Sequence, residues 1–246
     1  MISVRPVEGL PEVEPGAALG AMLAAAAELG AEDVLVVSQK VVSKAEGRVR
    51  ALADVEPGDR AAELARTLGK DPRLVQLILD ESRSVVRAAG GVLIVETVGG
   101  LVCANAGIDS SNVPGEDVVV LLPEDPDGSA RRLRAEIDRA AGVAPAVIVA
   151  DSFGRPWRLG QTDVAIGCAG ILPLDDWRGR RDRDGRELQA TTIAIADEAA
   201  AAASLARDKA SSAPAAVLTG LGRHVVATDG PGAAALRRSE ADDLFR

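Results

Sequence analysis

Three polar segments of the sequence combine side chains that could bind a metal ion and a phosphate-bearing ligand. The segment 151–161 begins with Asp151, directly after the apolar run Ala-Val-Ile-Val-Ala, and also holds Arg155 and Arg158. A carboxylate at the end of a strand suits Mg²⁺ or Mn²⁺, because these ions take few protein carboxylates and complete their coordination with substrate phosphates. The arginines could hold anionic oxygens through forked hydrogen bonds. The alternative interpretation is a strand-end turn with two surface arginines.

The segments 38–48 and 105–115 carry the other candidate ligands. Lys40 and Lys44 are four positions apart, so a helix would place both on one face. They follow the apolar run 33–37, where α/β proteins place ligand sites, and we favour an anion or phosphate site over a solvated helix face. Asp109 and Asn112 could supply oxygen ligands or hydrogen bonds to a base, and a turn capped by local Asp and Ser hydrogen bonds is an equal alternative. Together the segments indicate metal-dependent handling of a phosphate-bearing ligand, without identifying the reaction.

The composition excludes several catalytic schemes. The chain has no tyrosine and a single histidine, His224, which excludes a tyrosine acid or base and a multi-histidine metal site. The pair Gly69-Lys70 is followed by Asp71 and lacks the upstream glycine of a Walker A loop. Neither GxGxxG nor GxSxG occurs. Dinucleotide-binding and serine-hydrolase motifs therefore offer no explanation for the polar segments.

The charge balance bears on partners and location. The net charge of −9 makes the surface as a whole repel nucleic acid and anionic lipid, so we expect neither as a partner. No run of 18 apolar residues occurs, and acidic residues stand where a signal peptide would need an apolar run. Cys103 and Cys168 lack zinc-site spacing and are predicted to be buried in a reducing compartment. These features predict a soluble, cytoplasmic protein.

The elements that must position these segments alternate between strand-like and helix-like patterns. The length predicts one large domain or two modest ones, with a core of Ala, Val, Leu and Ile because only four residues are aromatic. The expected helices are 17–29, 59–68, 71–80, 130–141 and 197–209, and the expected strands are 2–7, 33–37, 84–87, 92–97, 101–104, 118–122, 146–150, 188–195 and 215–218. The arginine-rich stretch 178–186 is expected to be an exposed loop. We predict an α/β (mixed α+β) fold of two subdomains, although no break in composition marks their boundary.

At the three segments the sequence resembles the coenzyme F420-0:L-glutamate ligase (F420 gamma-glutamyl ligase) family. The long matching stretches are VSQKVVSKAEGR, NAGIDSSNVPG and DSFGRPWRLGQTDVAIGCAG. The shorter blocks GLPEV, DPDGSA, DWRGRRDRDGREL and ADEAAAAA match in the same order, so the resemblance covers essentially the whole chain. It implies a two-domain ligase fold that forms an intertwined homodimer. It also implies the stand-alone form, without the C-terminal nitroreductase-like domain that some relatives carry.

The resemblance implies an amide ligase that uses GTP and one or two Mg²⁺ or Mn²⁺ ions, with a monovalent cation as a further candidate. GTP would phosphorylate the terminal carboxylate of F420-0, and the amine of L-glutamate would attack the acyl phosphate. Later rounds could add further glutamates through γ-links. Such chemistry depends on positioning and charge neutralisation more than on covalent catalysis.

The resemblance also assigns roles to individual residues. Those expected to contact the nucleotide are Leu10, Pro11, Glu12, Val13, Gln39, Lys40, Lys44, Asn112 and Lys209. Those expected to hold metal are Asp109, Asp151 and Ser152, and the expected catalytic set is Asp109, Asp151, Lys44 and Arg155. Ser152 stands where the family usually has Thr, and Lys209 stands where some members have an acidic ligand of a second metal. The loop 207–214 would close over the nucleotide.

Two other functions are compatible with these residues. One is a ligase of the same fold that acts on a different carboxylate, such as a modified F420 precursor. The other is a protein that binds a nucleotide or deazaflavin without catalysis. The presence of Asp109, Asp151 and Lys44 together favours an enzyme.

Overall fold

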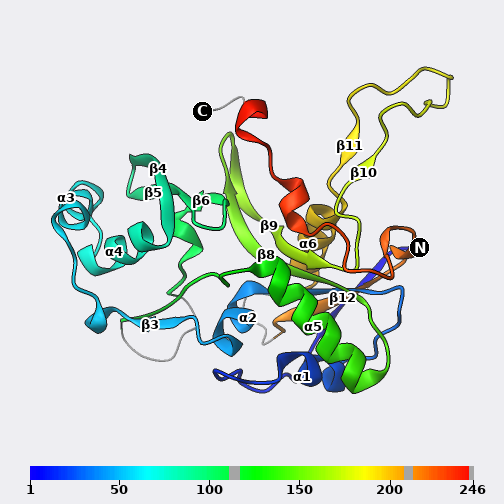
Figure 1. The fold of residues 1–246 in the computed structure, drawn as a ribbon, viewed down its shortest axis with the longest axis horizontal. Helices are drawn as coiled ribbons and strands as arrows, with labels where there is room; N and C mark the ends of the chain where they lie inside the picture. The colour runs from blue at the N-terminus through cyan, green and yellow to red at the C-terminus, as the bar shows by residue number, and fades with distance from the viewer. Residues whose placement is uncertain (111–116, 208–212, 244–246) are drawn as a thin grey trace.

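The computed structural model describes residues 1–110, 117–207 and 213–243 and is built around one five-stranded sheet (Figure 1). The strand order is β1-β12-β2-β8-β9. The bounds of these strands are β1 (Ser3–Val7), β12 (Ala215–Thr219), β2 (Val34–Ser38), β8 (Ala146–Arg155) and β9 (Arg158–Ala169). Strands β2 and β8 are parallel, and the other neighbouring pairs are antiparallel. The fold is therefore mixed α/β, as the alternating pattern predicted.

Helices cover both faces of this sheet. Alternate residues of β2, such as Leu35 and Val37, pack with α1 (Leu19–Ala26) and α5 (Pro126–Ala141). The intervening residues pack with α6 (Ile195–Ala206) on the opposite face. Because strand side chains alternate between faces and both faces are covered, β2 is apolar from Val34 to Val37 and β8 is apolar from Ala146 to Ala150.

A smaller unit lies beside the central sheet, at the left of Figure 1. It consists of α3 (Asp59–Leu68), α4 (Pro72–Asp80) and a three-stranded antiparallel sheet of β4 (Ser82–Ala89), β5 (Val92–Thr97) and β6 (Val102–Ala104). The amphipathic faces of both helices pack on β5 to form a separate core. The short antiparallel ladder between β3 (Val49–Ala51) and β7 (Val118–Val120) joins this unit to the rest. Whether the chain divides here into two domains stays a prediction.

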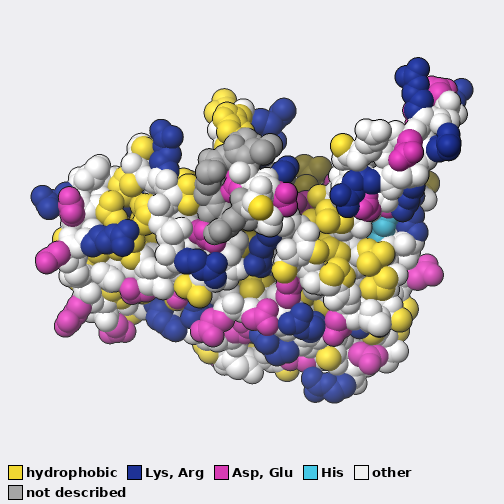
Figure 2. All heavy atoms as spheres, turned by 45° about the horizontal axis from the view of Figure 1, so that its top comes forward, with side chains coloured by type: hydrophobic (Ala, Val, Ile, Leu, Met, Phe, Trp, Pro, Cys, Tyr) yellow, Lys and Arg dark blue, Asp and Glu magenta, His cyan; other side chains and the backbone are white. Residues whose placement is uncertain are grey.

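A long arm projects between β10 (Asp175–Asp176) and β11 (Thr192–Ile193). Figure 1 shows it extending away from the central sheet, and Figure 2 shows basic side chains gathered at its tip. The predicted exposed loop 178–186 lies in this arm and is confirmed as largely exposed. The other short elements are α2 (Gln39–Ala45), η1 (Leu52–Asp54), η2 (Asn105–Gly107), η3 (Gly222–His224), η4 (Ala233–Leu236) and η5 (Glu240–Asp242).

Most predicted elements are confirmed, and the errors have physical reasons. Helix α5 begins at Pro126 rather than 130, because the Asp125 side chain accepts a hydrogen bond from the Gly128 N–H and proline suits the first helical turn. The predicted strand 188–195 was wrong except at Thr192–Ile193. The predicted end of the strand at 150 was also wrong, since β8 continues to Arg155 and returns as β9. Cys103 and Cys168 are buried free thiols, as expected.

No helix within the described ranges is long and apolar enough to cross a membrane.

Candidate active site

The parallel pairing of β2 with β8 brings two of the predicted segments to one edge of the sheet. Ser38, the last residue of β2, lies opposite Ala150 of β8. Lys40 therefore follows one strand where Asp151 continues the other. This edge, beyond the carboxyl end of a parallel pair, is the usual place for a ligand in an open α/β sheet.

Asp109 reaches this edge from a strained turn. Asn105 and Ala106 have φ values of 52° and 54°, which L-residues rarely adopt. Gly107 also has positive φ, and a Cβ there would lie 2.6 Å from the Leu122 side chain. The backbone of Asp109 then pairs with Val120 through two hydrogen bonds of 3.0 and 2.8 Å. The turn and this pairing fix where the Asp109 carboxylate points.

Lys40 and Asp109 form an ion pair that closes this part of the site. The Lys40 Nζ lies 2.8 Å from the Asp109 Oδ2, and the side chains are 18% and 36% exposed, respectively. The charges of Asp109 and Lys40 both act on the Asp151 carboxyl. We call Lys40, Asp109 and Asp151 the strand-end cluster. Residues from three segments far apart in the sequence are thus brought together, as the motif analysis predicted.

Burial dominates the electrostatics of Asp151. It raises the pKa of the Asp151 carboxyl to about 7 from 3.8, and repulsion from Asp163 and Asp109 adds to the rise. The Ser152 backbone N–H and the Lys40 charge act in the opposite direction without restoring the usual pKa. Burial and the Asp151 charge also raise the pKa of the Cys103 thiol to about 12, so Cys103 stays a neutral thiol at physiological pH. When Asp151 is ionised, the two carboxylates of the cluster carry more negative charge than Lys40 offsets.

The loop 10–13 and helix α2 form the neighbouring part of the site. The Lys44 Nζ lies 2.6 Å from the Glu12 carboxylate. Gln39 is buried and accepts a 2.9 Å hydrogen bond from the Ser43 hydroxyl. Val13 belongs to the hydrophobic core, and Leu10 packs against this core, while Pro11 is exposed. The helical spacing of the two lysines is confirmed, and each pairs with a carboxylate from a different segment.

Ser152 belongs to a different network from Asp151. Consecutive residues of a strand point to opposite faces, and the Ser152 hydroxyl donates a 2.6 Å hydrogen bond to Asp163 of β9. The other Asp163 oxygen lies 2.5 Å from the Arg207 guanidinium, and both side chains are about nine-tenths buried. Sequence reasoning missed Asp163 and Arg207, because only the register of the β8–β9 hairpin shows that Asp163 faces Ser152.

Arg155 lies apart from these residues, near the tip of the β8–β9 hairpin. Four strand residues beyond Asp151 correspond to about 13 Å. Its guanidinium donates to the carbonyls of Leu159 and Gly160 in the same hairpin. Trp157, at the tip, is 72% exposed. The catalytic role of Arg155 stays a prediction. The predicted nucleotide contacts Asn112 and Lys209 lie outside the described residues.

The donor set of the strand-end cluster fits a divalent cation. Mg²⁺ and Mn²⁺ bind through one or two carboxylates with water and phosphate oxygens as the remaining ligands. A partly neutralised pair of carboxylates, one of them with a raised pKa, offers such a site. Among the residues that the structure describes, no group of three or more His, Cys, Asp or Glu side chains is arranged to hold a metal ion. The cation would therefore depend on a ligand's own oxygens.

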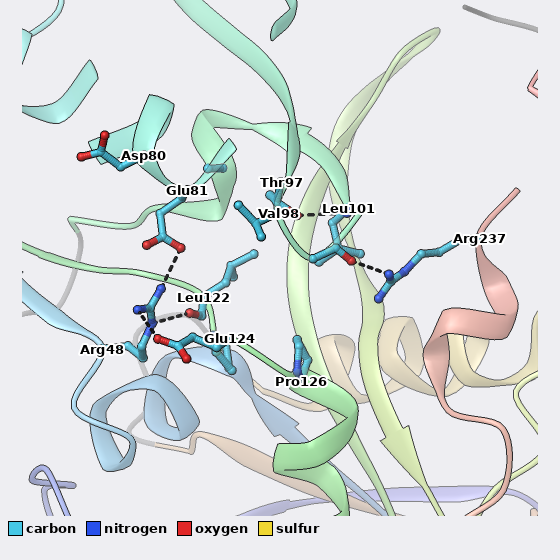
Figure 3. Close-up of a pocket in the computed structure, with 13 residues that line it drawn as sticks. Arg48, Asp80, Glu81, Thr97, Val98, Leu101, Leu122, Glu124, Pro126 and Arg237 are labelled. Carbon is cyan, nitrogen blue, oxygen red and sulfur yellow. Dashed lines mark hydrogen bonds and ion pairs between the residues drawn. The ribbon is translucent and has the colours of Figure 1, made fainter. Parts of the chain in front are cut away.

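A cavity of about 350 Å³ lies between the smaller unit and the start of α5 (Figure 3). Arg48, on its wall, donates to the Leu122 carbonyl and to the carboxylates of Glu81 and Glu124 at 2.7–3.0 Å. We call these residues the Arg48 cluster. On the opposite wall the Arg237 guanidinium donates to the Gly99 carbonyl. The Arg48 cluster links the start of β3, the end of α4 and the segment before α5. Arg48 itself is buried, and we interpret the cluster as a structural junction between these elements.

The model of the F420-0:Gamma-glutamyl ligase family matches residues 9–220. That match includes the central sheet from β2 to β12, the smaller unit and every member of the strand-end cluster. The chain therefore belongs to this family of ligases.

Individual relatives agree with the family match over most of their length. The protein named Coenzyme F420:L-glutamate ligase from Methanopyrus kandleri is 44% identical over 247 residues, which cover 100% of this chain and 98% of the relative. Proteins of the same name are 50% identical in Haloarcula marismortui, over 83% of this chain and 81% of the relative, and 41% identical in Methanothermobacter thermautotrophicus, over 100% and 99%. The family resemblance stated from the motifs is confirmed.

Proposed function

We propose that this protein joins L-glutamate to coenzyme F420-0 in a reaction driven by GTP and dependent on Mg²⁺ or Mn²⁺. The family match and the names of the relatives support the two substrates. The observation that carries the metal and nucleotide part is the strand-end cluster, where Lys40, Asp109 and Asp151 meet at the edge of a parallel strand pair. The lysine there suits a phosphate, and the carboxylates suit a hard cation.

The proposed role of each residue follows from its charge. Asp109 and Asp151 would hold the cation, which supplies positive charge against the phosphate oxygens when bound. Lys40 and Lys44 would bind the phosphates, and Gln39 with the loop 10–13 would contact the rest of the nucleotide. Ser152 would serve a second cation only from the other face of β8, where it now bonds to Asp163. Arg155, Asn112 and Lys209 stay predicted contacts of anionic substrate groups.

The reaction would proceed by two displacements. A carboxylate oxygen of F420-0 attacks the γ-phosphorus of GTP, the bond to the bridging oxygen breaks, and GDP leaves. The amine nitrogen of L-glutamate then attacks the acyl carbon, phosphate leaves, and the nitrogen loses a proton to water. Both steps bring anions together, so charge neutralisation at the strand-end cluster is the main contribution expected of the protein. A repeat of the cycle on the new γ-carboxylate would lengthen the tail.

We also propose that the protein acts as a homodimer. The family resemblance supports this proposal, and the exposed hydrophobic residues Trp157 and Leu159 on the projecting hairpin are consistent with burial against a second copy. Analytical ultracentrifugation at several concentrations tests it. A monomer at micromolar concentration would contradict it.

Product analysis tests the proposed reaction directly. The protein is incubated with F420-0, L-glutamate, GTP and Mn²⁺ or Mg²⁺, and product mass and phosphate release are followed. We expect the mass of one or more glutamyl residues to appear with equal phosphate release. Phosphate release with a different carboxylate but not with F420-0 would favour a ligase of another substrate. Binding of GTP without any product would favour a non-catalytic protein.

A further inference from the structure

Lys40 forms an ion pair with Asp109, one of the carboxylates that the proposed cation would need. Its Nζ lies 2.8 Å from the Asp109 Oδ2, which is the distance of a direct charge-assisted hydrogen bond. Its charge also acts on Asp151, the other carboxylate of the cluster. The Lys40 ammonium group therefore offsets charge on both carboxylates. A divalent cation that binds there must displace it or share the site with a like charge.

The cost of displacing Lys40 depends on what receives its ammonium group. The Lys40 side chain is only 18% exposed, so an ammonium group pushed off Asp109 would lose a direct charged contact without full access to water. A cation that arrives with a polyphosphate brings anionic oxygens that can accept the ammonium group. A cation that arrives alone brings none.

We propose that Lys40 makes the site selective for a metal–nucleotide complex over the free metal ion. The ammonium group competes with a bare cation for Asp109, and moves onto phosphate when the cation and nucleotide bind together. Metal and nucleotide then favour each other's binding through Lys40, and this coupling is reciprocal. The inference rests on the proposed metal- and nucleotide-dependent function. It adds that Lys40 is the residue that makes binding of the cation depend on the nucleotide.

Lys44 provides a matched comparison on the same helix. It lies one turn further along α2 and is similarly covered, with a side chain 11% exposed. Its partner is Glu12 at 2.6 Å. Glu12 is 67% exposed and belongs to the loop 10–13 rather than to the strand-end cluster. The two lysines therefore have the same chemistry and different carboxylates. Only Lys40 should affect a cation that binds without nucleotide.

The test measures Mn²⁺ binding, by the EPR signal of free Mn²⁺, with and without GDP. In Lys40→Met the affinity for Mn²⁺ alone should rise about tenfold, because a competing unit charge next to the carboxylate is lost. The gain in Mn²⁺ affinity that GDP produces in the wild type should shrink by a similar factor. In Lys44→Met the affinity for Mn²⁺ alone should match the wild type, and GDP affinity should fall. Lys70→Met, in the linker between α3 and α4, controls for the change in net charge.

The outcomes separate this inference from the proposed function. Wild-type protein that binds neither Mn²⁺ nor GDP would overturn both. Wild-type binding of both ligands, with unchanged or weaker affinity of Lys40→Met for Mn²⁺ alone, would overturn the role of Lys40 and leave the metal site standing. An equal rise in Lys44→Met or Lys70→Met would show a general charge effect and also overturn it. Lys40→Gln, which keeps a polar side chain, should behave like Lys40→Met.

Discussion

The strand-end cluster and the Arg48 cluster each place one basic side chain against two carboxylates, with different results. The Arg48 guanidinium donates separately to Glu81, Glu124 and the Leu122 carbonyl, so its fork satisfies every partner in one fixed geometry. In the strand-end cluster the Lys40 ammonium is bound to Asp109, while burial raises the pKa of Asp151 to about 7. The comparison teaches that a satisfied cluster holds elements together, whereas an under-compensated one leaves charge for a ligand.

The largest effect should come from removing a carboxylate of the strand-end cluster. Asp151→Asn and Asp109→Asn should each lower turnover on the order of a thousandfold, because metal neutralisation of phosphate charge supplies several kcal/mol and each 1.36 kcal/mol is tenfold in rate. Product mass spectrometry under single-turnover conditions measures this. Far-ultraviolet circular dichroism should show an intact fold. Near-wild-type turnover in either variant would place the metal elsewhere.

The pH dependence of stability should show the same cluster in metal-free protein. The folded-state pKa of Asp151 is raised, so between pH 4 and 7 the folded protein binds a proton that the unfolded chain has released. Its contribution to the free energy of unfolding is therefore most favourable below pH 4, falls as pH rises to 7, and costs up to about 4 kcal/mol above that. Urea unfolding in EDTA from pH 5 to 8 measures this slope. Asp151→Asn should flatten the slope and stabilise the protein at pH 8, and a wild-type slope in that variant would contradict the assignment.

Breaking the Arg48 cluster should affect stability rather than cation binding. Arg48→Met leaves Glu81 and the Leu122 carbonyl without their partner, which should cost about 2–3 kcal/mol, less than a fully buried pair because Glu124 is 79% exposed. The midpoint of urea unfolding measures the loss. Mn²⁺ affinity of the folded protein should not change, and a large loss of that affinity would make the two clusters one functional unit.

The smallest effect should come from the partly exposed ion pair between Arg132 of α5 and Glu46 at the end of α2. Arg132 is 57% exposed and lies 2.6 Å from Glu46. Arg132→Met should change the free energy of unfolding by less than about 1 kcal/mol, because water screens the pair. Equal costs for Arg132→Met and Arg48→Met would show that burial does not distinguish the Arg48 cluster.

The sequence allowed the strand-end cluster to be predicted because its residues follow strong local signals. The apolar runs 33–37 and 146–150 predicted two buried strands, and polar residues directly after them had to meet if the strands were parallel neighbours. The residues alone left Asp109 open between an oxygen ligand and a capped turn, and the motif resemblance favoured the ligand. Its position depends on positive φ values at Asn105 and Ala106 that no composition rule predicts.

The Ser152 network could not be predicted in the same way. Polar and apolar residues alternate poorly between 151 and 164, so no pattern with a period of two residues predicted the hairpin. Without the register of the β8–β9 hairpin, the sequence does not reveal that Asp163 contacts Ser152, and nothing distinguishes Arg207 from the many other arginines. For the same reason Asp151 and Ser152 were expected to serve one site, whereas the structure places their side chains on opposite faces of β8.

The most direct measurement of the central claim is a Mn²⁺ titration by EPR in the presence of GDP, on wild-type protein, Asp151→Asn and Arg48→Met. If the under-compensated carboxylates hold the cation, the wild type and Arg48→Met should bind Mn²⁺ alike, and Asp151→Asn should lose binding. Undiminished Mn²⁺ binding by Asp151→Asn, with loss in Arg48→Met, would contradict the assignment and place the cation at the other cluster.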